Sequence, residues 1–317
     1  MKYKPVDLNN VKLQSIKQRK HKVRIADFGK VPKSSNPSLS AYLDSLPNIL
    51  AAKDFHEIVK AIVTACRKKK PVIVMLGGHT IKCGIAPFII DLMEKRIITA
   101  VAMNGSTSIH DFEIGYYGET SEQVSETLDQ GTFGMVQETG NLMHQAITEG
   151  LITGVGLGRA LGNKLIEIKA KNKQLSILAT AAKLDIPVTV HVAIGTDTIH
   201  QHPAVDGAAL GESSLLDFRL LTAVVKDLNN GGVVLNIGSA VILPEVFLKV
   251  LTIARNLGYP VKNFSTANFD MYQHYRPQVN VVQRPTHLGG KGYSITGHHE
   301  LMIPLLTAGV LLALKGK

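Results

Sequence analysis

Small and polar residues follow hydrophobic runs at five places in this chain, where they could approach a phosphate or a ribose. The five junctions are Val72–Leu76 before Gly77-Gly78-His79-Thr80, Ile98–Met103 before Asn104-Gly105-Ser106-Thr107, Pro187–Ile194 before Gly195-Thr196-Asp197, Val233–Ile237 before Gly238-Ser239-Ala240, and Phe264 before Ser265-Thr266-Ala267-Asn268. Residues with little side chain let backbone N–H groups come close to a ligand. Turn formers are also common in ordinary loops. Because the feature recurs at nearly every expected strand end, we favour a nucleotide-sized ligand.

Other side chains in these loops could carry acid–base, nucleophilic or metal chemistry. Lys291 lies between Gly290 and Gly292, so we expect it in a flexible loop that can reach into a cleft. Histidines are dense in the loops, and imidazole titrates near neutral pH. Asp197 and Asp206 flank His200-Gln201-His202, a spacing that could supply metal ligands but also arises by chance. We therefore predict no metal site.

The elements that would position these residues alternate between strands and helices. Val- and Ile-rich apolar runs of this length are typical of buried parallel strands. We expect strands at 72–76, 98–103, 187–194, 233–237 and 261–265. We expect helices at 42–69, 84–95, 109–116, 121–128, 135–149, 159–170, 174–184, 213–228, 244–257 and 299–314. This order predicts one large α/β domain, a doubly wound, mostly parallel Rossmann-like sheet with helices on both faces. The carboxyl ends of its strands form one edge, where ligands bind.

The segment Gly154-Val155-Gly156-Leu157-Gly158 looks like a dinucleotide fingerprint but lacks its context. No buried strand precedes it, and its spacing is wrong for a phosphate-binding turn. We interpret it as a structural loop before helix 159–170.

The composition of the chain limits the classes of protein to which it can belong. The chain has 317 residues, a formal charge of +10 and two cysteines, Cys66 and Cys83, which do not make a disulfide framework. We therefore expect a protein of the reducing cytoplasm. No apolar run is long enough for a membrane span, and we expect no membrane partner. Residues 1–45 form a basic, irregular N-terminal extension, and residues 46–317 form the α/β domain. The extension lacks interleaved aromatic residues, so we expect no nucleic-acid partner.

The order of several motifs resembles the deoxyhypusine synthase family. The resemblance covers residues 45–315 and runs through Cys83-Gly84-Ile85, Asn104-Gly105, Ile186-Pro187 with Gly195-Thr196-Asp197, Thr266-Ala267-Asn268-Phe269-Asp270, Arg276-Pro277, Gly290-Lys291 and Leu301-Met302-Ile303-Pro304-Leu305-Leu306. No single motif is specific, but their common order is hard to obtain by chance.

This resemblance implies NAD as the cofactor and a catalytic role for Lys291. The residues it places against NAD are His79, Asn104, Gly105, Asp111, Thr196, Asp197, Gly238, Ser239, Thr266, Ala267 and Asp270. The implied reaction is aminobutyl transfer from spermidine. NAD oxidises the carbon beside a secondary amine, Lys291 holds the fragment as a Schiff base, and a protein lysine or a small amine accepts it. A neutral lysine would be required. The resemblance also implies a homo-oligomer, a tetramer with sites between paired subunits.

The residues expected to bind the substrate and to transfer protons differ from those of the deoxyhypusine synthase family. Gly289 replaces the family's tryptophan, Ile242 stands near its catalytic histidine, and its polyamine-binding acids fall near Gln273 and Pro285. Other acids would then bind the ammonium groups, with Glu113, Glu245 and Glu300 as candidates. His274 and His298 are our candidates for the missing acid–base residue. Two alternatives remain open: an NAD-binding enzyme with a different, non-polyamine substrate, and a non-catalytic nucleotide-binding sensor.

Overall fold

The computed structural model describes residues 2–315, so Met1 and the last two residues of the expected α/β domain lie outside the described part. Within it the chain divides into two compact units, residues 1–53 and residues 54–317. In the first unit, short 3₁₀ turns at Ile16–Gln18 and Ile25–Asp27 precede helix α1 (Leu39–Asp44). Many apolar side chains of this unit are exposed, among them Tyr3, Leu13, Ile25 and Val31.

The helix expected at 42–69 is two helices, so that prediction is wrong. Helix α1 ends at Asp44, and helix α2 runs from Leu50 to Arg67. Pro47 lies between them, and Leu50 has a positive φ of 50°. Proline restricts the residue before it to extended backbone, which interrupts a helix.

Six parallel strands form the sheet, in the spatial order β3-β2-β1-β4-β5-β6. They are β1 (Val72–Leu76), β2 (Ala100–Asn104), β3 (Val188–His191), β4 (Val233–Ile237), β5 (Ser265–Asp270) and β6 (Lys291–Thr296). All residues of β1, β3 and β4 are buried, as expected for a sheet covered on both faces. The predicted fold class is confirmed: a Rossmann-like α/β sheet whose strand order reverses between β1 and β4.

Two strand predictions are wrong near the C-terminus. The strand expected at 261–265 begins only at Ser265, so Thr266, Ala267 and Asn268 belong to the strand and not to the loop after it. Strand β6 was not expected, because Lys291–Thr296 is not a continuous apolar run and only Tyr293 and Ile295 in it are buried. Its apolar residues Tyr293 and Ile295 are two positions apart, which is only weak evidence for a strand. The neighbouring Gly290 and Gly292 favoured a loop instead.

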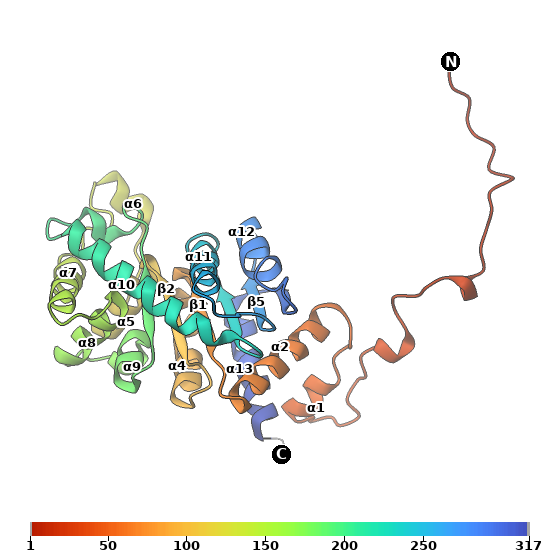
Figure 1. The fold of residues 1–317 in the computed structure, drawn as a ribbon, viewed down its shortest axis with the longest axis horizontal. Coiled ribbons are helices and arrows are strands. Elements are labelled where there is room, and N and C mark those ends of the chain that lie inside the picture. Colours follow the sequence, from red (N-terminus) through yellow and green to blue (C-terminus); the bar gives the residue numbers. More distant parts are fainter. Residues whose placement is uncertain (1, 316–317) are drawn as a thin grey trace. The chain divides into compact units, whose positions relative to one another are not determined.

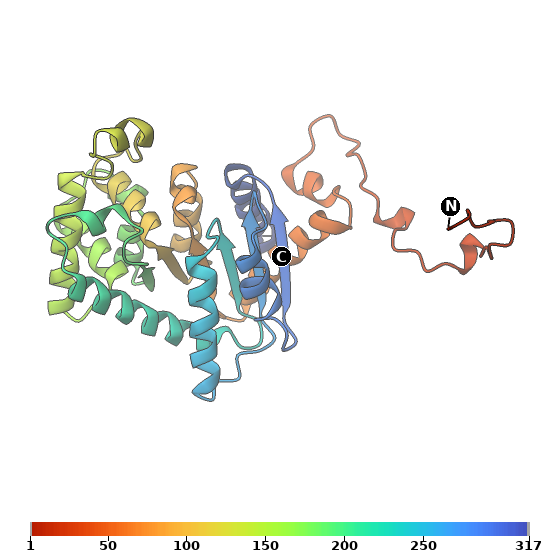
Figure 2. The ribbon, with the colours of Figure 1, turned by 90° about the horizontal axis from the view of Figure 1, so that it is seen from above.

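Helices cover both faces of this sheet (Figures 1 and 2). Helices α10 (Gly207–Val225) and α11 (Ile242–Asn256) pack on one face, where Leu221, Phe247 and Phe264 share a core cluster with Ile73 and Val234. Helices α4 (Ala86–Glu94) and α13 (His299–Lys315) lie on the other face, with α13 against α2 at Gly309. Burial of these apolar stripes provides most of the stabilisation.

The remaining helices extend the fold beyond the β3 edge or stand at strand ends. They are α3 (Gly78–Lys82), α5 (Gly105–Tyr116), α6 (Val124–Asp129), α7 (Gln137–Ile152), α8 (Leu157–Glu167) and α9 (Ile177–Leu184). Helices α5, α7, α8 and α9 pack on one another as a cluster (Figure 1). A short helix, α12 (Tyr275–Pro277), and a π-helix (Gln278–Gln283) link β5 to β6. None of the helices among residues 2–315 combines the length and apolar composition needed to cross a membrane.

Two fully buried aspartates fix this helical cluster. Asp111 of α5 accepts hydrogen bonds from the Ser176 hydroxyl at 2.6 Å and from the N–H groups of Ile177 and Leu178, at the start of α9. Asp217 of α10 accepts from the N–H of Gly158, at the start of α8, at 2.8 Å and from Val190 at 2.7 Å. Each carboxylate satisfies free N–H groups at a helix N-terminus. The Gly154–Gly158 segment is thus the start of α8, and its Gly158 N–H binds a side chain of the same chain.

We expect Asp217 to make folding stability depend on pH. Burial raises the pKa of Asp217 to about 7, above its ordinary value of 3.8. A raised folded-state pKa contributes stability that is full below pH 3.8 and is lost as the pH rises through about 7. Relative to Asp217→Asn, the wild-type free energy of unfolding should therefore fall across that window, by on the order of a few kcal/mol. Urea unfolding at several pH values measures it. Parallel profiles would contradict the assignment, and the exposed Asp227→Asn is the matched control.

Candidate functional site

The loops that leave the carboxyl ends of the strands bring most of the predicted binding residues to one edge of the sheet. His79 follows β1, Asn104 ends β2, Asp197 follows β3, Ser239 follows β4 and Asp270 ends β5. Gly105, Thr196, Gly238 and His298 lie in the same set of connections. The six strands are parallel, so these connections share one edge. Their proximity is a consequence of topology, and their role in cofactor binding stays a prediction.

Close backbone contact marks the point where the strand order reverses. A Cβ atom on Gly77 would lie 2.0 Å from the carbonyl oxygen of Gly238, so only glycine fits there. Gly238 has φ of 68°, and His299 packs against it. His299 is buried, with Nε2 3.2 Å from the carbonyl oxygen of Phe269, and its Nδ1 has no hydrogen-bond partner. An orphaned nitrogen beside a glycine-lined strand end is a feature that a bound ligand would explain.

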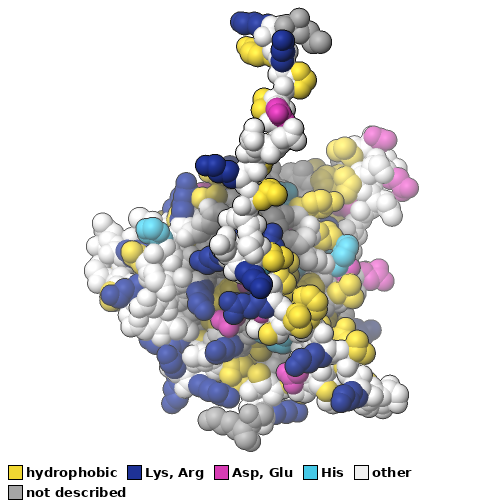
Figure 3. Space-filling model, turned by 90° about the vertical axis from the view of Figure 1, so that its right-hand side faces the viewer, with side chains coloured by type: hydrophobic (Ala, Val, Ile, Leu, Met, Phe, Trp, Pro, Cys, Tyr) yellow, Lys and Arg dark blue, Asp and Glu magenta, His cyan; other side chains and the backbone are white. Residues whose placement is uncertain are grey.

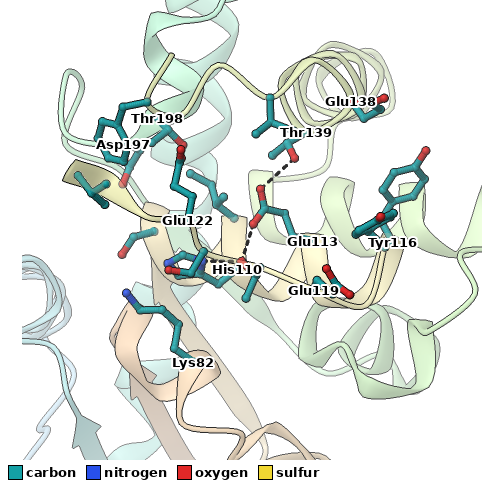
Figure 4. Close-up of a pocket in the computed structure, with 18 of the residues that line it drawn as sticks. Lys82, His110, Glu113, Tyr116, Glu119, Glu122, Glu138, Thr139, Asp197 and Thr198 are labelled. Carbon is teal, nitrogen blue, oxygen red and sulfur yellow. Dashed lines mark hydrogen bonds between the residues drawn. The ribbon is translucent and has the colours of Figure 1, made fainter. Parts of the chain in front are cut away.

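A cavity of about 700 Å³ opens beside this edge, next to β2 and β3. Its walls come from α5, the segment 116–124, the start of α7 and the loop after β3, with Lys82 of α3 at one side (Figure 4). A volume of this size suits a small-molecule ligand. Of the predicted site residues, only Thr196, Asp197 and Glu113 line it.

Acidic side chains dominate the charged lining of the cavity. Its five acidic residues are Glu113, Glu119, Glu122, Glu138 and Asp197, against the single lysine Lys82. The chain as a whole carries a formal charge of +10, and Figure 3 shows Lys and Arg spread widely over one face of the molecule. Carboxylates gathered in a concave site of a basic protein favour a cationic ligand by charge complementarity.

Glu113 is held in place by two threonine hydroxyls. Thr120 donates to its Oε2 at 2.5 Å, and Thr139 of α7 donates to its Oε1 at 2.9 Å. The Nδ1 atom of His110, one turn earlier on α5, lies 2.7 Å from the same Thr120 hydroxyl. Burial, together with the charge of Lys82, lowers the pKa of His110 to about 4. The imidazole of His110 is therefore neutral at neutral pH.

Asp197 lies against the N-terminus of α5. A Cβ atom on Gly105, the first residue of α5, would come 1.9 Å from Asp197 Oδ2, and the Ser106 N–H bonds the carboxylate. Burial raises the pKa of Asp197 to about 6. His200 Nε2 lies 3.7 Å from Asp197 Oδ2, and neither atom has a hydrogen-bond partner. Since the N–H groups of Gly195 and Asp197 donate to His200 Nδ1, the proton of a neutral His200 sits on Nε2, facing the carboxylate.

Three predicted cofactor contacts are placed elsewhere by the fold. Asp111 is fully buried with its oxygens bonded at the start of α9, which leaves its predicted contact with NAD without support from this structure. Thr266 and Ala267 are buried inside β5, and the Thr266 hydroxyl donates to the carbonyl of Val281 at 2.7 Å. The sequence placed them at a strand end only because β5 begins later than expected.

Lys291 is not in a flexible loop, which corrects that prediction. It is the first residue of β6 and pairs in register with Ser265, the first residue of β5. Within one chain it therefore lies at the amino edge of the sheet, opposite the edge that carries the cavity. Its Nζ is exposed and lies 3.2 Å from Glu57 Oε2. The hydrogen bond with Glu57 raises the pKa of Lys291, whereas a nucleophilic lysine needs a lowered pKa.

The histidines proposed for acid–base or metal chemistry are dispersed. His274 is exposed in the loop after β5, and His298 is exposed with Nδ1 3.7 Å from Glu300 Oε1. His202 stacks on His144 at a ring separation of 6.1 Å. Among residues 2–315, no group of three or more His, Cys, Asp or Glu side chains is arranged to hold a metal ion.

Sequence reasoning identified one of the cavity's four glutamates. Glu113 was among the three candidate acids. Glu245 of α11 instead accepts a hydrogen bond from Asn280 at 2.8 Å and pairs with Arg276 of α12, and Glu300 is exposed at the start of α13. Glu119, Glu122 and Glu138 were missed, because Glu122 and Glu138 fell within the helices expected at 121–128 and 135–149 and Glu119 just before the first of them, away from any expected strand end. Their local density of charge, next to a small-residue strand end, was the signal available.

Comparison with known proteins supports the fold. No protein-family model matches this sequence, and no curated protein matches it. Among solved structures, a LOR/SDH-type protein from Methanococcus maripaludis S2 aligns with a TM-score of 0.51 and 16% identity over 89% of this chain and 73% of that one. AgrE, in its ternary complex with ornithine and NAD+, aligns with a TM-score of 0.50 and 11% identity over 84% of this chain and 34% of that one.

The coverage is unequal. This chain spans about a third of the length of the AgrE chain and of ArgZ, an arginine dihydrolase from cyanobacteria. A deoxyhypusine synthase-type protein from Entamoeba histolytica also aligns, with 10% identity over 87% of this chain and 92% of that one, at a TM-score of 0.49. At these identities the likeness shows the shared fold.

We expect Gly105→Ala to disturb the contact between Asp197 and α5. The added methyl group would collide with Asp197 Oδ2, so the loop after β3 must move or the helix start must shift. Overpacking of this kind lowers the free energy of unfolding by about 1–3 kcal/mol, measurable by urea unfolding. Gly207→Ala, also at the first residue of a helix but with open space around its Cβ, is the matched control. Equal stability of the two variants would contradict the proposed contact.

Proposed function

We propose that this chain is an NAD-dependent enzyme that acts on a substrate carrying an ammonium group. Three observations support the proposal. The sheet has the strand order of dinucleotide-binding folds. AgrE, which shares the fold at 11% identity, has been crystallised with ornithine and NAD+. The proposed class of substrate, an amine, rests on the cavity with five acidic residues beside the carboxyl edge of the sheet.

The residues at the strand reversal fit a dinucleotide. Gly77, Gly78 and Gly238 let the strand ends approach one another closely there, and His79 and His299, whose rings lie 6.1 Å apart, offer polar side chains. The orphaned Nδ1 of His299 is the buried polar atom that such a ligand would satisfy. Asp270, at the end of β5, would accept hydrogen bonds from ribose hydroxyls. When bound, NAD would accept a hydride from the carbon beside the substrate nitrogen.

The cavity residues would hold the substrate cation. A carboxylate pairs with an ammonium group through charge-assisted hydrogen bonds. Glu113, locked by Thr120 and Thr139, offers a preorganised anion, while Glu122 is fixed by the Gly134 N–H at 2.9 Å. The aromatic rings of Tyr116 and Phe133 would exclude water from the bound alkyl chain. A pyrophosphate would be repelled by the same acids, so we expect the dinucleotide phosphates at the glycine-lined strand ends instead.

Ligand titration tests the proposal. Isothermal titration should detect binding of NAD, and L-ornithine or spermidine should bind more tightly in its presence. The double variant Glu122→Gln, Glu138→Gln removes two negative charges with little change of shape. It should weaken binding of the amine by about tenfold or more for each charged hydrogen bond that is lost, since such a bond contributes about 1.5–3 kcal/mol, and leave the affinity for NAD unchanged.

Glu94→Gln, an exposed change on α4 away from the cavity, is the control. Absence of NAD binding would refute the proposed cofactor. Binding of NAD with no amine binding and no reduction of NAD by any amine would favour the non-catalytic sensor instead.

A finer proposal is aminoalkyl transfer through a Schiff base on Lys291, as the resemblance to deoxyhypusine synthases implies. In one chain Lys291 lies at the sheet edge opposite the cavity, so this reaction would require a second copy of the chain to bring its Lys291 to the site. The expected homo-oligomer, a tetramer in that family, would offer such an arrangement.

Borohydride trapping tests the transfer reaction. With NAD and spermidine present, reduction should fix a covalent adduct on Lys291, detectable by peptide mass spectrometry, and Lys291→Ala should abolish transfer while NAD affinity is retained. If Lys291→Ala remains active, the Schiff base mechanism is wrong. Lys262→Ala, an exposed lysine near the same sheet edge, is the matched control.

A further inference from the structure

Three side chains of the cavity wall form a continuous hydrogen-bonded line. His110 Nδ1 lies 2.7 Å from the Thr120 hydroxyl oxygen, and that hydroxyl lies 2.5 Å from Glu113 Oε2. His110 and Glu113 are one turn apart on α5, and Thr120 lies in the segment that follows this helix. The two hydrogen bonds therefore hold that segment against α5. Figure 4 shows His110 between Lys82 and Glu113 on the same wall.

Proton counting fixes the direction of these hydrogen bonds. A carboxylate can only accept, so the single hydroxyl proton of Thr120 points to Glu113. The Thr120 oxygen must then accept from His110, which places the imidazole proton on Nδ1. Nε2 of the neutral ring consequently carries a lone pair. The Thr139 hydroxyl, which donates to the other oxygen of Glu113 at 2.9 Å, keeps the carboxylate from turning away.

Charged groups around His110 act in opposite directions. Lys82 of α3 favours the neutral ring, and together with burial it lowers the pKa of His110 to about 4. Glu113 of the same helix, Asp197 of the loop after β3 and Glu122 of the segment before α6 line the same cavity and favour the cationic ring. The line through Thr120 also stabilises an imidazolium when it forms, since Nδ1 keeps its acceptor.

We propose that His110 is the proton acceptor of this site, a catalytic residue whose Nε2 takes a proton from the substrate ammonium group, with Thr120 and Glu113 as positioning residues. The assignment rests on the proposed function, because it needs an ammonium-bearing substrate in the cavity. In this step an N–H bond of the ammonium breaks, an Nε2–H bond forms, and the electron pair stays on the substrate nitrogen. The proton then passes from Nε2 to water. The freed lone pair is what makes the adjacent carbon able to give up a hydride.

Nitrogen NMR of histidine-labelled protein tests the line directly. In wild type, His110 should be the Nδ1–H tautomer. Thr120→Val removes the hydroxyl acceptor and should convert it to a mixture of tautomers, while Thr120→Ser should restore the wild-type spectrum. Lys82→Met removes a nearby positive charge and should raise the pKa of His110. Thr252→Val, which removes a hydroxyl on α11 outside the cavity, should change none of these signals.

Kinetics give the second readout, with reduction of NAD by L-ornithine or spermidine as the assay. His110→Gln should lower kcat by about 10²–10⁴-fold. Thr120→Val should lower it by about fivefold, the equivalent of one neutral hydrogen bond, and Thr120→Ser should recover it.

An Nε2–H tautomer in wild type, or a tautomer unaffected by Thr120→Val, would overturn the assignment even if NAD and amine bind. Full activity of His110→Gln would do the same. Conversely, the expected tautomer in a protein that binds neither NAD nor amine would leave the hydrogen-bonded line intact and would refute the proposed function.

Discussion

Helix N-termini in this fold are held by aspartates that come from other elements. Asp111 meets the start of α9, Asp217 the start of α8, and Asp197 the start of α5. A helix N-terminus presents free N–H groups and a partial positive charge, so a carboxylate without a basic partner can be buried there. Burial raises the pKa of all three, which shows that the helix ends only partly replace the lost hydration. The cluster of helices beside β3, and the cavity among them, depends on these contacts.

The aspartates also decide where an anion can bind. The N-terminus of α5 lies next to the carboxyl edge, but Asp197 already lies against it. The glycine-lined ends of β1 and β4 carry no such carboxylate contact at Gly77 and Gly238. The edge is therefore divided into an acidic part beside β2 and β3 and a part beside β1 and β4 that suits phosphates. This division is the physical basis for assigning the dinucleotide and the amine to different places.

The basic charge of the chain and the acidic lining of the cavity serve different interactions. Long-range attraction depends on net charge and is screened beyond about 10 Å at 0.1 M salt. Inside a cavity the nearest groups dominate, and here they are five acidic residues with Lys82 and a neutral His110. A chain whose net charge attracts anions to its surface thus encloses a cavity whose charged lining is mostly acidic.

The sequence by itself determined the fold class, because strand burial and helix periodicity are local patterns that the Rossmann-like sheet preserves. It also gathered His79, Gly105, Asp197 and Ser239 at one edge, since parallel strands place their carboxyl ends together. Only the tertiary structure decided which polar residues face a cavity. In the tertiary structure Asp111 caps the start of α9, Thr266 is buried in β5, and Lys291 lies at the amino edge of the sheet, opposite the cavity. The physical reason is the position of the strand ends. Strand β5 begins four residues later than expected and β6 was not expected, so residues predicted in loops belong to strands. No local pattern fixes where a strand begins when both faces of the sheet are covered.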